Sequence, residues 1–421
     1  MRAMVQLRGI TWNHTRGFAP LAATAQAFAD QHPGVDITWD RRSLWAFGEQ
    51  PLETLVSAYD LLVIDHPMIG WAATTGALVA FDDQPPHDVT GRLQHQYVGA
   101  SAESYQYDGH EFAFALDAAC QVAAARMDLL ERAGEPPPRT WEAVLDLARR
   151  TRRVALPLNP IDALSALLTL CAHLGAPAGQ HGDGFLHEEV TAEAIRLLRD
   201  LACLVDERCH DANPIAVLNR MSRTDEILYC PLVFGYTNYS RAGYAPRALT
   251  FTDIPCQGGD VPAGSCLGGA GLAVSASSPH IDIAVAYARW VTDPETQRTE
   301  YVRAGGQPAA TAAWEDPTAN ELTRHFFTDT RATIEAAYLR PRHPGFPAFQ
   351  TDVAPLVRQA VLGSLSPVEL IETVNQRYAE SLAWRPGPLS GPPAAHTPTP
   401  DVRPTPPHHN DSSGRTTREE P

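Results

Sequence analysis

Residues 267–310 read LGGAGLAVSASSPHIDIAVAYARWVTDPETQRTEYVRAGGQPAA, and most of this stretch has a helical pattern. Apolar side chains recur at the spacing of one helix face over 281–291, which predicts a helix packed against a core. The run Asp-Pro-Glu at 293–295 supplies a cap, a first-turn proline and a first-turn acid, which restart a helix. The Gly-Gly pair at 305–306 ends it. The stretch therefore predicts a long helical pair near 280–304.

Strand and helix patterns alternate along the first part of the chain. Three short apolar stretches indicate strands: VQLRGITW (5–12), VDITW (35–39) and YDLLVID (59–65). Helix patterns follow them: an amphipathic run from Pro20 that stops at His32-Pro33-Gly34, a run around Leu52, Leu55 and Val56, and a helix opened by Pro67. The order βαβαβα predicts an α/β fold with a parallel or mostly parallel sheet and helices on its faces.

Polar side chains follow each of these three strands. The clusters are Trp12 to Arg16, Asp40 to Ser43, and Asp65 with His66. In sheets of this kind the ligand crevice lies beyond the carboxyl ends of the strands. The three clusters should therefore share one rim of the sheet and offer hydrogen-bonding groups to a bound molecule.

The middle of the chain is predicted to be mainly helical. The run TWEAVLDLARRT (140–151) begins with a threonine cap and carries apolar residues at helical spacing. Two further helices are predicted over 163–174 and 191–207. Strands are then expected over 226–236 and 248–255.

Composition excludes several classes of function. The 421 residues carry a net charge of -16, from 33 basic and 49 acidic residues, which argues against a nucleic-acid or anionic-membrane partner. Every basic residue is an arginine, so the lysines of Schiff-base enzymes, P-loops and kinases are absent. The chain has no HExxH, GxSxG or GxGxxG motif. No uncharged apolar run reaches the length of about 18 residues that a transmembrane helix needs.

Three other features have simple interpretations. The Pro-rich segment 385–421 is expected to be a disordered tail. Its His408-His409 pair could bind a metal ion adventitiously, but no metal ligand is predicted. The seven cysteines form no CxxC pair and are expected to be buried and reduced, with a Cys203–Cys209 bridge left open. Residues 1–17 contain no apolar stretch with a small-residue cleavage site, so no export signal is expected in the chain as written.

Two stretches resemble one protein family. The segment 267–310 is similar to a signature segment of the type 1 extracellular solute-binding proteins, the carbohydrate-type receptors of ABC importers. It shows a Gly-Gly turn, a strand of the LAVS kind, an amphipathic helix, a TDPETQ break and then GGQP. Residues 114–149, FALDAACQVAAARMDLLERAGEPPPRTWEAVLDLAR, resemble the family's crossover into its second lobe. The order and spacing of the motifs match over about residues 5–384.

The resemblance implies a two-lobe α/β fold of the periplasmic-binding-protein-like, type II or Venus-flytrap kind, with crossing hinge strands. Lobe one would comprise 1–113 and 250–308, and lobe two 114–249 and 309–384. The family holds its solute in the cleft between the lobes and needs no cofactor or catalytic group. By this resemblance, the residues that face the cleft include Asp117 just past the first crossing, Tyr236, Asn238 and Tyr239 from lobe two, and Gly268-Gly269 from lobe one.

Polyol ligands need paired donors and acceptors for their hydroxyl groups, and aromatic faces for the apolar side of the ring. The rim clusters and the residues implied by the resemblance supply both. The predicted ligand-binding residues are Trp12, Asn13, His14, Arg41, Asp65, His66, Asp117, Tyr236, Asn238, Tyr239, Gly268 and Gly269.

Other roles stay open for several residues. The alternatives are a core position for Trp12 and His66, a helix cap at Asp65 and Asp162, and a surface turn for 236–240. Arg16 and Arg41 would serve an acidic or phosphorylated solute, so the sequence leaves neutral sugar and anion both open.

The sequence thus predicts a solute receptor of an ABC-type importer that binds a small polar molecule, in the first place a carbohydrate. It is expected to be a monomer, to close about its hinge, and to have an ABC permease as its partner if it is exported. Two alternatives are a cytoplasmic ligand sensor of the same fold and an enzyme that uses His14 or His66 as a base. The family implies an extracytoplasmic location, whereas the chain as written predicts a cytoplasmic one.

Overall fold

The computed structural model describes residues 4–85, 96–180, 184–257 and 261–387. The predicted tail, apart from its first three residues, and the His408-His409 pair lie outside the described residues.

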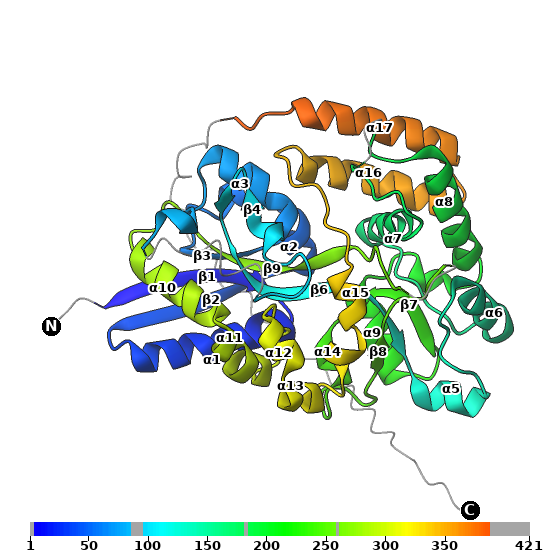
Figure 1. Ribbon diagram of the computed structural model, residues 1–421, viewed down its shortest axis with the longest axis horizontal. Helices are drawn as coiled ribbons and strands as arrows, with labels where there is room; N and C mark the ends of the chain where they lie inside the picture. Colours follow the sequence, from blue (N-terminus) through cyan, green and yellow to red (C-terminus); the bar gives the residue numbers. More distant parts are fainter. Residues whose placement is uncertain (1–3, 86–95, 181–183, 258–260, 388–421) are drawn as a thin grey trace, which may run out of the picture. The chain divides into compact units, whose positions relative to one another are not determined.

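One seven-stranded sheet has the order β2-β1-β3-β9-β6-β7, with β8 paired to β6 (Figure 1). Its strands are β1 (Val5–Trp12), β2 (Val35–Arg42), β3 (Leu61–Ile64), β6 (Phe114–Ala125), β7 (Tyr229–Phe234), β8 (Thr250–Thr252) and β9 (Leu267–Val274). A separate two-stranded ladder consists of β4 (Gln106–Tyr107) and β5 (His110–Glu111). Only the pairs of β1 with β2 and with β3 are parallel; β9 and the strands beyond it pair antiparallel. The expectation of a mostly parallel sheet is therefore wrong beyond β3, because β9 enters from a distant part of the chain in the opposite direction.

Helices cover this sheet. The α-helices are α1 (Thr15–Gln31), α2 (Leu44–Glu49), α3 (Ile69–Thr75), α5 (Met127–Ala133), α6 (Trp141–Thr151), α7 (Pro160–His173), α8 (Glu188–Ala202), α9 (Pro214–Arg223), α10 (Ile281–Thr292), α11 (Pro294–Thr296), α12 (Thr311–Glu315), α13 (Pro317–Leu322), α14 (Phe326–Asp329), α15 (Arg331–Glu335), α16 (Phe346–Val361) and α17 (Pro367–Ala383). Short 3₁₀ turns are η1 (Leu52–Thr54), η2 (His66–Met68), η3 (Phe81–Asp83), η4 (Glu103–Tyr105), η5 (Glu207–Cys209) and η6 (Thr237–Ser240), and η7 (Gln297–Tyr301) is a π turn.

The four residues of β3 show how the sheet is covered on both faces. All of them are fully buried, and successive side chains of a strand point to opposite faces. Leu61 and Val63 pack in a cluster with apolar residues of α1 and α10, whereas Leu62 and Ile64 pack in a second, larger cluster with α3. An unbroken apolar run of four residues is therefore what this position in the sheet requires.

The strand β6 connects two halves of the sheet. Its residues 114–120 pair with β9, and its residues 121–125 pair with β7 and β8. Every residue of β6 is buried. In the second half, α16 packs against α7, α8 and α17 (Figure 1). The predicted lobe boundaries at 113/114, 249/250 and 308/309 stay a prediction, and the pairing of β8 with β6 favours grouping residues 250–252 with the second half.

The predictions for the first part of the chain hold for the strands better than for the helices. The strands β1, β2 and β3 form where the patterns indicated. The first helix starts at Thr15, before the predicted Pro20, because the side chain of His14 accepts a hydrogen bond from the backbone N–H of Arg16 and caps it. The helix predicted around Leu52 is wrong: that segment is a 3₁₀ turn, and the regular helix is α2 just before it.

The helix boundaries farther along the chain are confirmed where a capping residue marked them. Thr140 caps α6 by accepting from the N–H of Ala143 at 3.2 Å. Asp293 caps α11 in the same way and Pro294 occupies its first turn. Gly305 has a φ of 98°, a left-handed conformation that favours glycine at a helix end.

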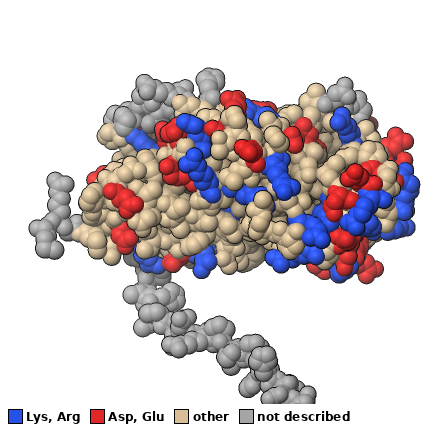
Figure 2. Space-filling view, turned by 90° about the horizontal axis from the view of Figure 1, so that it is seen from below, with Lys and Arg blue, Asp and Glu red and all other residues tan. Residues whose placement is uncertain are grey.

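The cysteine and membrane expectations can be compared with the described residues. All seven cysteines are free thiols, and only Cys203 is exposed, so the Cys203–Cys209 bridge is not formed. None of the described helices combines the length and the apolar character needed to cross a bilayer. Arginine and acidic side chains are interspersed over the face seen in Figure 2.

Gly269 is required where β9 pairs with β6. Its φ is 105°, and a Cβ at this position would lie 2.3 Å from the backbone oxygen of Asp117. We therefore expect Gly269→Ala to lower the free energy of unfolding by about 1–3 kcal/mol or more, measured by urea denaturation. The control is Gly48→Ala, where a Cβ meets nothing within 4 Å. Equal stability of the two variants would contradict the requirement for glycine at position 269.

Candidate functional site

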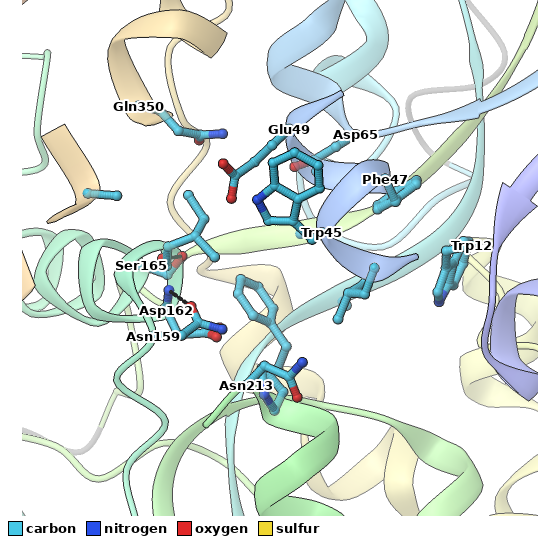
Figure 3. Close-up of a pocket in the computed structure, with 18 of the residues that line it drawn as sticks. Trp12, Trp45, Phe47, Glu49, Asp65, Asn159, Asp162, Ser165, Asn213 and Gln350 are labelled. Carbon is cyan, nitrogen blue, oxygen red and sulfur yellow. Dashed lines mark hydrogen bonds between the residues drawn. The ribbon is translucent and has the colours of Figure 1, made fainter. Parts of the chain in front are cut away.

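A cavity of about 450 Å³ lies where the two halves of the sheet meet (Figure 3). Its volume is within the range of small-molecule sites, about 300–1,000 Å³. It lies beyond the end of β1, and its walls come from α2 and β9 of the first half, from the N-terminal ends of α7 and α9, and from α16. Its polar and aromatic lining residues are Trp12, Arg16, Trp45, Phe47, Glu49, Asp65, Asp117, Asn159, Asp162, Ser165, Asn213, Phe234, Tyr236, Arg340, Gln350 and Thr351.

The short helix α2 brings an aromatic wall to the cavity. Ser43 caps this helix, because its hydroxyl accepts from the N–H of Ala46 at 3.1 Å. Phe47 packs against Trp12 with ring centroids 5.1 Å apart. Trp45 lines the cavity although 67% of it is exposed to solvent. An indole that faces a cavity and remains uncovered is available to stack on a bound molecule.

Two helices of the second half begin with the same sequence, Asn-Pro-Ile, and both starts line the cavity. Asn159 caps α7 by accepting from the N–H of Asp162, and Asn213 caps α9 by accepting from the N–H of Ala216. A proline follows at the first helical position of each, where its missing N–H costs nothing. Among the described residues the NH₂ group of Asn213 has no hydrogen-bond partner, so it is free to donate to a hydroxyl oxygen, whereas the Asn159 side chain also interacts with the carboxyl group of Asp162.

Arg16 is buried and paired with Asp117 at the base of the cavity. Its Nε donates to Asp117 Oδ2 at 2.8 Å, and its Nη2 donates to Asp117 Oδ1. Its Nη1 donates to the backbone oxygen of Gly235 at 2.7 Å, and the guanidinium lies 4.6 Å from the ring centre of Tyr236. The charge of this arginine is therefore neutralised within the protein.

A second buried pair joins Arg340 to Asp65. The Nη2 of Arg340 lies 3.0 Å from both carboxylate oxygens, and its Nη1 donates to Gln350 Oε1 at 2.9 Å. Burial alone would raise the pKa of Asp65, but the charge of Arg340 and the hydrogen bonds from His66 and Arg340 hold it well below its usual range. Asp65 also caps η2, as considered from the sequence, by accepting from the N–H of His66 at 2.9 Å.

Two other carboxyl groups of the cavity have no arginine partner in the part of the chain that the structure describes. Asp162 lies in the first turn of α7 and is 3% exposed. Its Oδ2 has no hydrogen-bond partner, and burial raises its pKa to about 8. Burial also raises the pKa of Glu49 on α2. The alternative that Asp162 caps its helix is wrong, because the cap is Asn159, three residues earlier.

The cavity contains some of the predicted ligand-binding residues and not others. Those that line it are Trp12, Asp65, Asp117, Tyr236, Gly268 and Gly269. Those that do not are Asn13, His14, Arg41, His66, Asn238 and Tyr239. Contact with a solute stays a prediction for all of them.

The residues outside the cavity have identifiable structural roles. His14 caps α1 and its Nε2 lies 3.1 Å from the hydroxyl of Tyr244. Arg41 is exposed and stacks over Phe18. Asn238 donates to the backbone oxygen of Gly305 at 2.9 Å, which fastens η6 to the loop after η7.

His66 is fully buried beneath the cavity, with Nδ1 3.3 Å from Asp65 Oδ1. Burial, followed by the charge of Arg340, lowers its pKa to about 4. An imidazole with so low a pKa is a poor general base at neutral pH.

Several lining residues were not predicted from the sequence. Trp45, Phe47 and Glu49 sit on a helix that the pattern placed too late, and Arg340 comes from a segment with no rim signal. The repeated Asn-Pro-Ile at 159–161 and 213–215 is a signal that could have been found, since each copy opens a helix toward the cavity.

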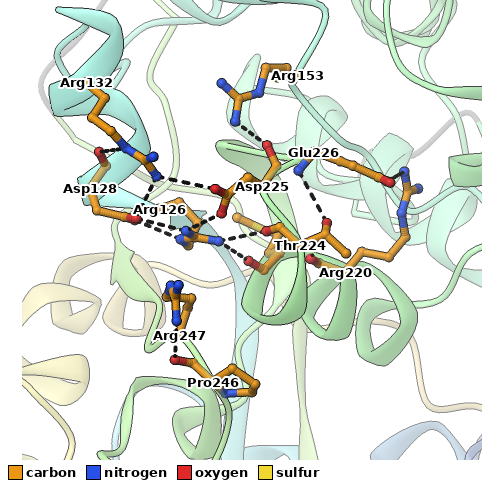
Figure 4. Close-up of polar contacts among 11 residues, drawn as sticks. Arg126, Asp128, Arg132, Arg153, Arg220, Thr224, Asp225, Glu226, Pro246 and Arg247 are labelled. Atoms are coloured by element: carbon orange, nitrogen blue, oxygen red, sulfur yellow. Dashed lines mark hydrogen bonds and ion pairs between the residues drawn. The ribbon is translucent and has the colours of Figure 1, made fainter.

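A second group of arginines lies away from the cavity, at the end of β6 (Figure 4). Arg126 uses all its donors there, on Asp128, Asp225 and the backbone oxygens of Met221 and Thr224. A guanidinium whose donors are all used binds the chain together and offers nothing to a ligand. Arg126 is therefore structural.

Comparison with known proteins gives one family and one fold. The sequence model of the bacterial extracellular solute-binding proteins matches residues 23–326. The maltose-bound MalE3 of T. maritima is 16% identical, with a TM-score of 0.76 over 89% of this chain and 99% of that one. A solute-binding protein of an ABC transporter from Agrobacterium radiobacter, in complex with ribitol, is 18% identical with a TM-score of 0.74, over 90% and 98%. The GacH receptor of Streptomyces glaucescens is 17% identical with a TM-score of 0.75, over 90% and 99%. These likenesses confirm the resemblance and the two-lobe α/β fold predicted from the sequence.

Breaking the Arg16–Asp117 pair should destabilise the fold. We expect Asp117→Ala to cost about 3–5 kcal/mol in the free energy of unfolding, because it leaves a buried guanidinium unpaired. Asp146→Ala is the control, since its pair with Arg149 is about half exposed and should be worth about 0–1 kcal/mol. Urea unfolding of both variants measures the difference, and equal effects would show that the buried pair has no special weight.

His66 should make stability depend on pH. The pKa of His66 is about 4 in the folded protein and 6.5 in the unfolded chain. Between pH 4 and 6.5 this imidazole is therefore protonated only in the unfolded chain. Stability is then lost as pH falls from 6.5 toward 4, by at most about 1.4 kcal/mol per pH unit for this group. We expect His66→Gln to reduce the pH slope of the unfolding free energy by about one proton. An unchanged slope would mean that His66 is protonated in the folded protein.

Proposed function

The chain belongs to the bacterial extracellular solute-binding proteins, and from this membership we propose that it is the solute receptor of an ABC-type importer. Its solute is a sugar or a related polyhydroxylated compound, held in the cavity between α2 and the starts of α7 and α9. Its partner is the permease of that importer, and it acts as a monomer.

The observation that carries this proposal is the combination of aromatic rings with hydrogen-bonding groups around one cavity. Trp12, Trp45 and Phe47 offer apolar faces on one side, and Asn159, Asn213 and Ser165 lie on the other (Figure 3). Sugars present an apolar ring face and a rim of hydroxyl groups. The aromatic rings match the ring face, and the hydrogen-bonding side chains match the hydroxyl groups. The maltose and ribitol bound to the similar solved structures support the same class of solute.

The charges of the cavity argue against an anionic solute. Arg16 and Arg340 are its arginines, and each is already paired with a buried carboxylate. An added carboxylate or phosphate would have to compete with Asp117 or Asp65 for them. The alternative of an acidic or phosphorylated solute is therefore not part of the proposal.

The solute is longer than one sugar ring. A second hollow of about 570 Å³ adjoins the cavity and shares Glu49, Thr351 and Pro355 with it. Trp71 and Trp384 line this second hollow. Together the two spaces give a groove with aromatic surfaces along its length, which suits two or more linked rings.

Binding is accompanied by closure rather than by chemistry. The exposed Trp45 and the helix starts opposite it stand on different halves of the molecule, so a hinge movement would bury a solute between them. A solute shifts the balance toward the closed form only by its higher affinity for that form. The enzyme alternative loses support because His66 and His14, the bases it named, do not line the cavity.

Calorimetric titration with maltose, ribitol and D-mannitol tests the proposal. We expect at least one of these compounds to bind, to raise the thermal unfolding midpoint, to be recovered unchanged, and to reduce the radius of gyration in solution scattering. Absence of binding across sugars and polyols, or appearance of a chemical product, would overturn it.

Trp45 should contribute to affinity without contributing to the fold. Because 67% of it is exposed, we expect Trp45→Ala to leave thermal stability unchanged and to weaken sugar binding about 5- to 30-fold, or about 1–2 kcal/mol. Trp384→Ala is the matched control, because Trp384 lines only the second hollow. It should leave the affinity for a monosaccharide-sized ligand unchanged. Unchanged affinity in Trp45→Ala would remove this residue from the site.

A further inference from the structure

The carboxyl groups of the cavity outnumber its arginines. The carboxyl groups are Glu49, Asp65, Asp117 and Asp162, and the arginines are Arg16 and Arg340. The two ion pairs use Asp117 and Asp65 and leave Asp162 and Glu49 without a cation. With all groups ionised the cavity therefore carries an excess of negative charge.

Asp162 is the more demanding of the two. It is 97% buried, and Oδ2 has no hydrogen-bond partner among the described residues. Its position in the first turn of α7 favours a negative charge, but the N-cap role belongs to Asn159, so capping does not account for a buried acid here. A buried carboxylate is normally paired with a cation or supplied with hydrogen bonds.

Among the described residues Asp162 has no ion pair with an arginine or a histidine. The ionisable groups near enough to sense its charge are Cys230 on β7, Cys266 before β9, and Tyr236 after β7. None of these is basic. Burial raises the pKa of Asp162 to about 8, and only the hydrogen bond with Asn159 opposes that rise. The empty cavity therefore favours the protonated form of Asp162 at neutral pH, and a cation supplied by the solute would favour its carboxylate.

Glu49 and the aromatic wall add to the same preference. Glu49 approaches the cavity from α2, on the side opposite Asp162 (Figure 3). Trp45, Phe234 and Tyr236 line the space between them, and the faces of aromatic rings attract cations. A positively charged group inside the cavity would therefore meet carboxylates on two sides and ring faces around it.

We propose that the solute is an amine-bearing sugar or polyol whose ammonium group pairs with the carboxylate of Asp162. The inference rests on the proposed function and narrows its solute class. A neutral sugar would leave Asp162 protonated at neutral pH, because burial raises its pKa to about 8, whereas an ammonium group would stabilise the ionised form. An ammonium group supplies both the hydrogen bond and the charge, and such charge-assisted bonds are the stronger kind. Glu49 supports the same group from the opposite wall.

Matched pairs of ligands that differ only in an amine test the proposal: glucosamine against glucose, and the glucosamine disaccharide with free amines against cellobiose. Titration of the wild-type protein at low salt should show tighter binding of the amine in at least one pair, by about 10-fold. Asp162→Asn keeps the size and removes the charge, and it should abolish that preference. Glu49→Gln should reduce it. Glu131→Gln, an exposed carboxyl on α5 outside the cavity, is the control and should preserve it.

The outcomes separate the two proposals. Neutral sugars binding as tightly as their amine partners would overturn the amine inference and leave the proposed function standing. A preference that survives in Asp162→Asn would overturn the assignment to Asp162 and give that residue a purely structural role. Absence of binding by both neutral and amine sugars would overturn both proposals. If Asp162→Asn does not fold, the wild-type preference and the effect of Glu49→Gln still decide.

Discussion

The buried pair of Arg16 and Asp117 holds together the parts of the protein that form the cavity. Arg16 comes from α1, Asp117 from the crossing strand β6, and the third acceptor, the oxygen of Gly235, follows β7 in the second half. Desolvating two charges is costly, and it is tolerated only when the geometry is good and the remaining donors are satisfied. Here a bidentate pair and a backbone acceptor meet that condition, so this interaction can lie at the base of a cavity without filling it.

The Arg340–Asp65 pair repeats this arrangement between β3 and the segment before α16. Its consequence is electrostatic as well as structural. Because both arginines of the cavity serve the fold, the charge available to a ligand is set by the carboxyl groups that remain. An arginine near a cleft is often taken as an anion site, but its partners decide whether its charge is free. In this protein both arginines that line the cavity are paired with carboxylates, so neither has a free charge for an anion.

The parts of the fold that follow from local sequence could be predicted, and the parts that depend on distant packing could not. Strand β3 and the caps at Thr140 and Asp293 are written within a few neighbouring residues. Arg340 and Asp65 are 275 residues apart, and no local pattern connects them. The rim prediction was right that β1 and β3 end at the cavity, through Trp12 and Asp65, but it could not foresee that His14 is used to cap α1.

Several buried polar atoms around the cavity have no hydrogen-bond partner among the described residues: Trp12 Nε1, Arg340 Nε and Asp162 Oδ2. Each such atom costs about 1–3 kcal/mol of stability when it stays unsatisfied. By contrast, every donor of Arg126 is paired. Other buried polar atoms without a partner, such as Trp141 Nε1 and Arg289 Nε, lie away from the cavity, so in the described part of the chain only the three beside it are available to a solute. A solute that bonds them would recover this free energy on binding, so the atoms that weaken the empty protein would strengthen the complex.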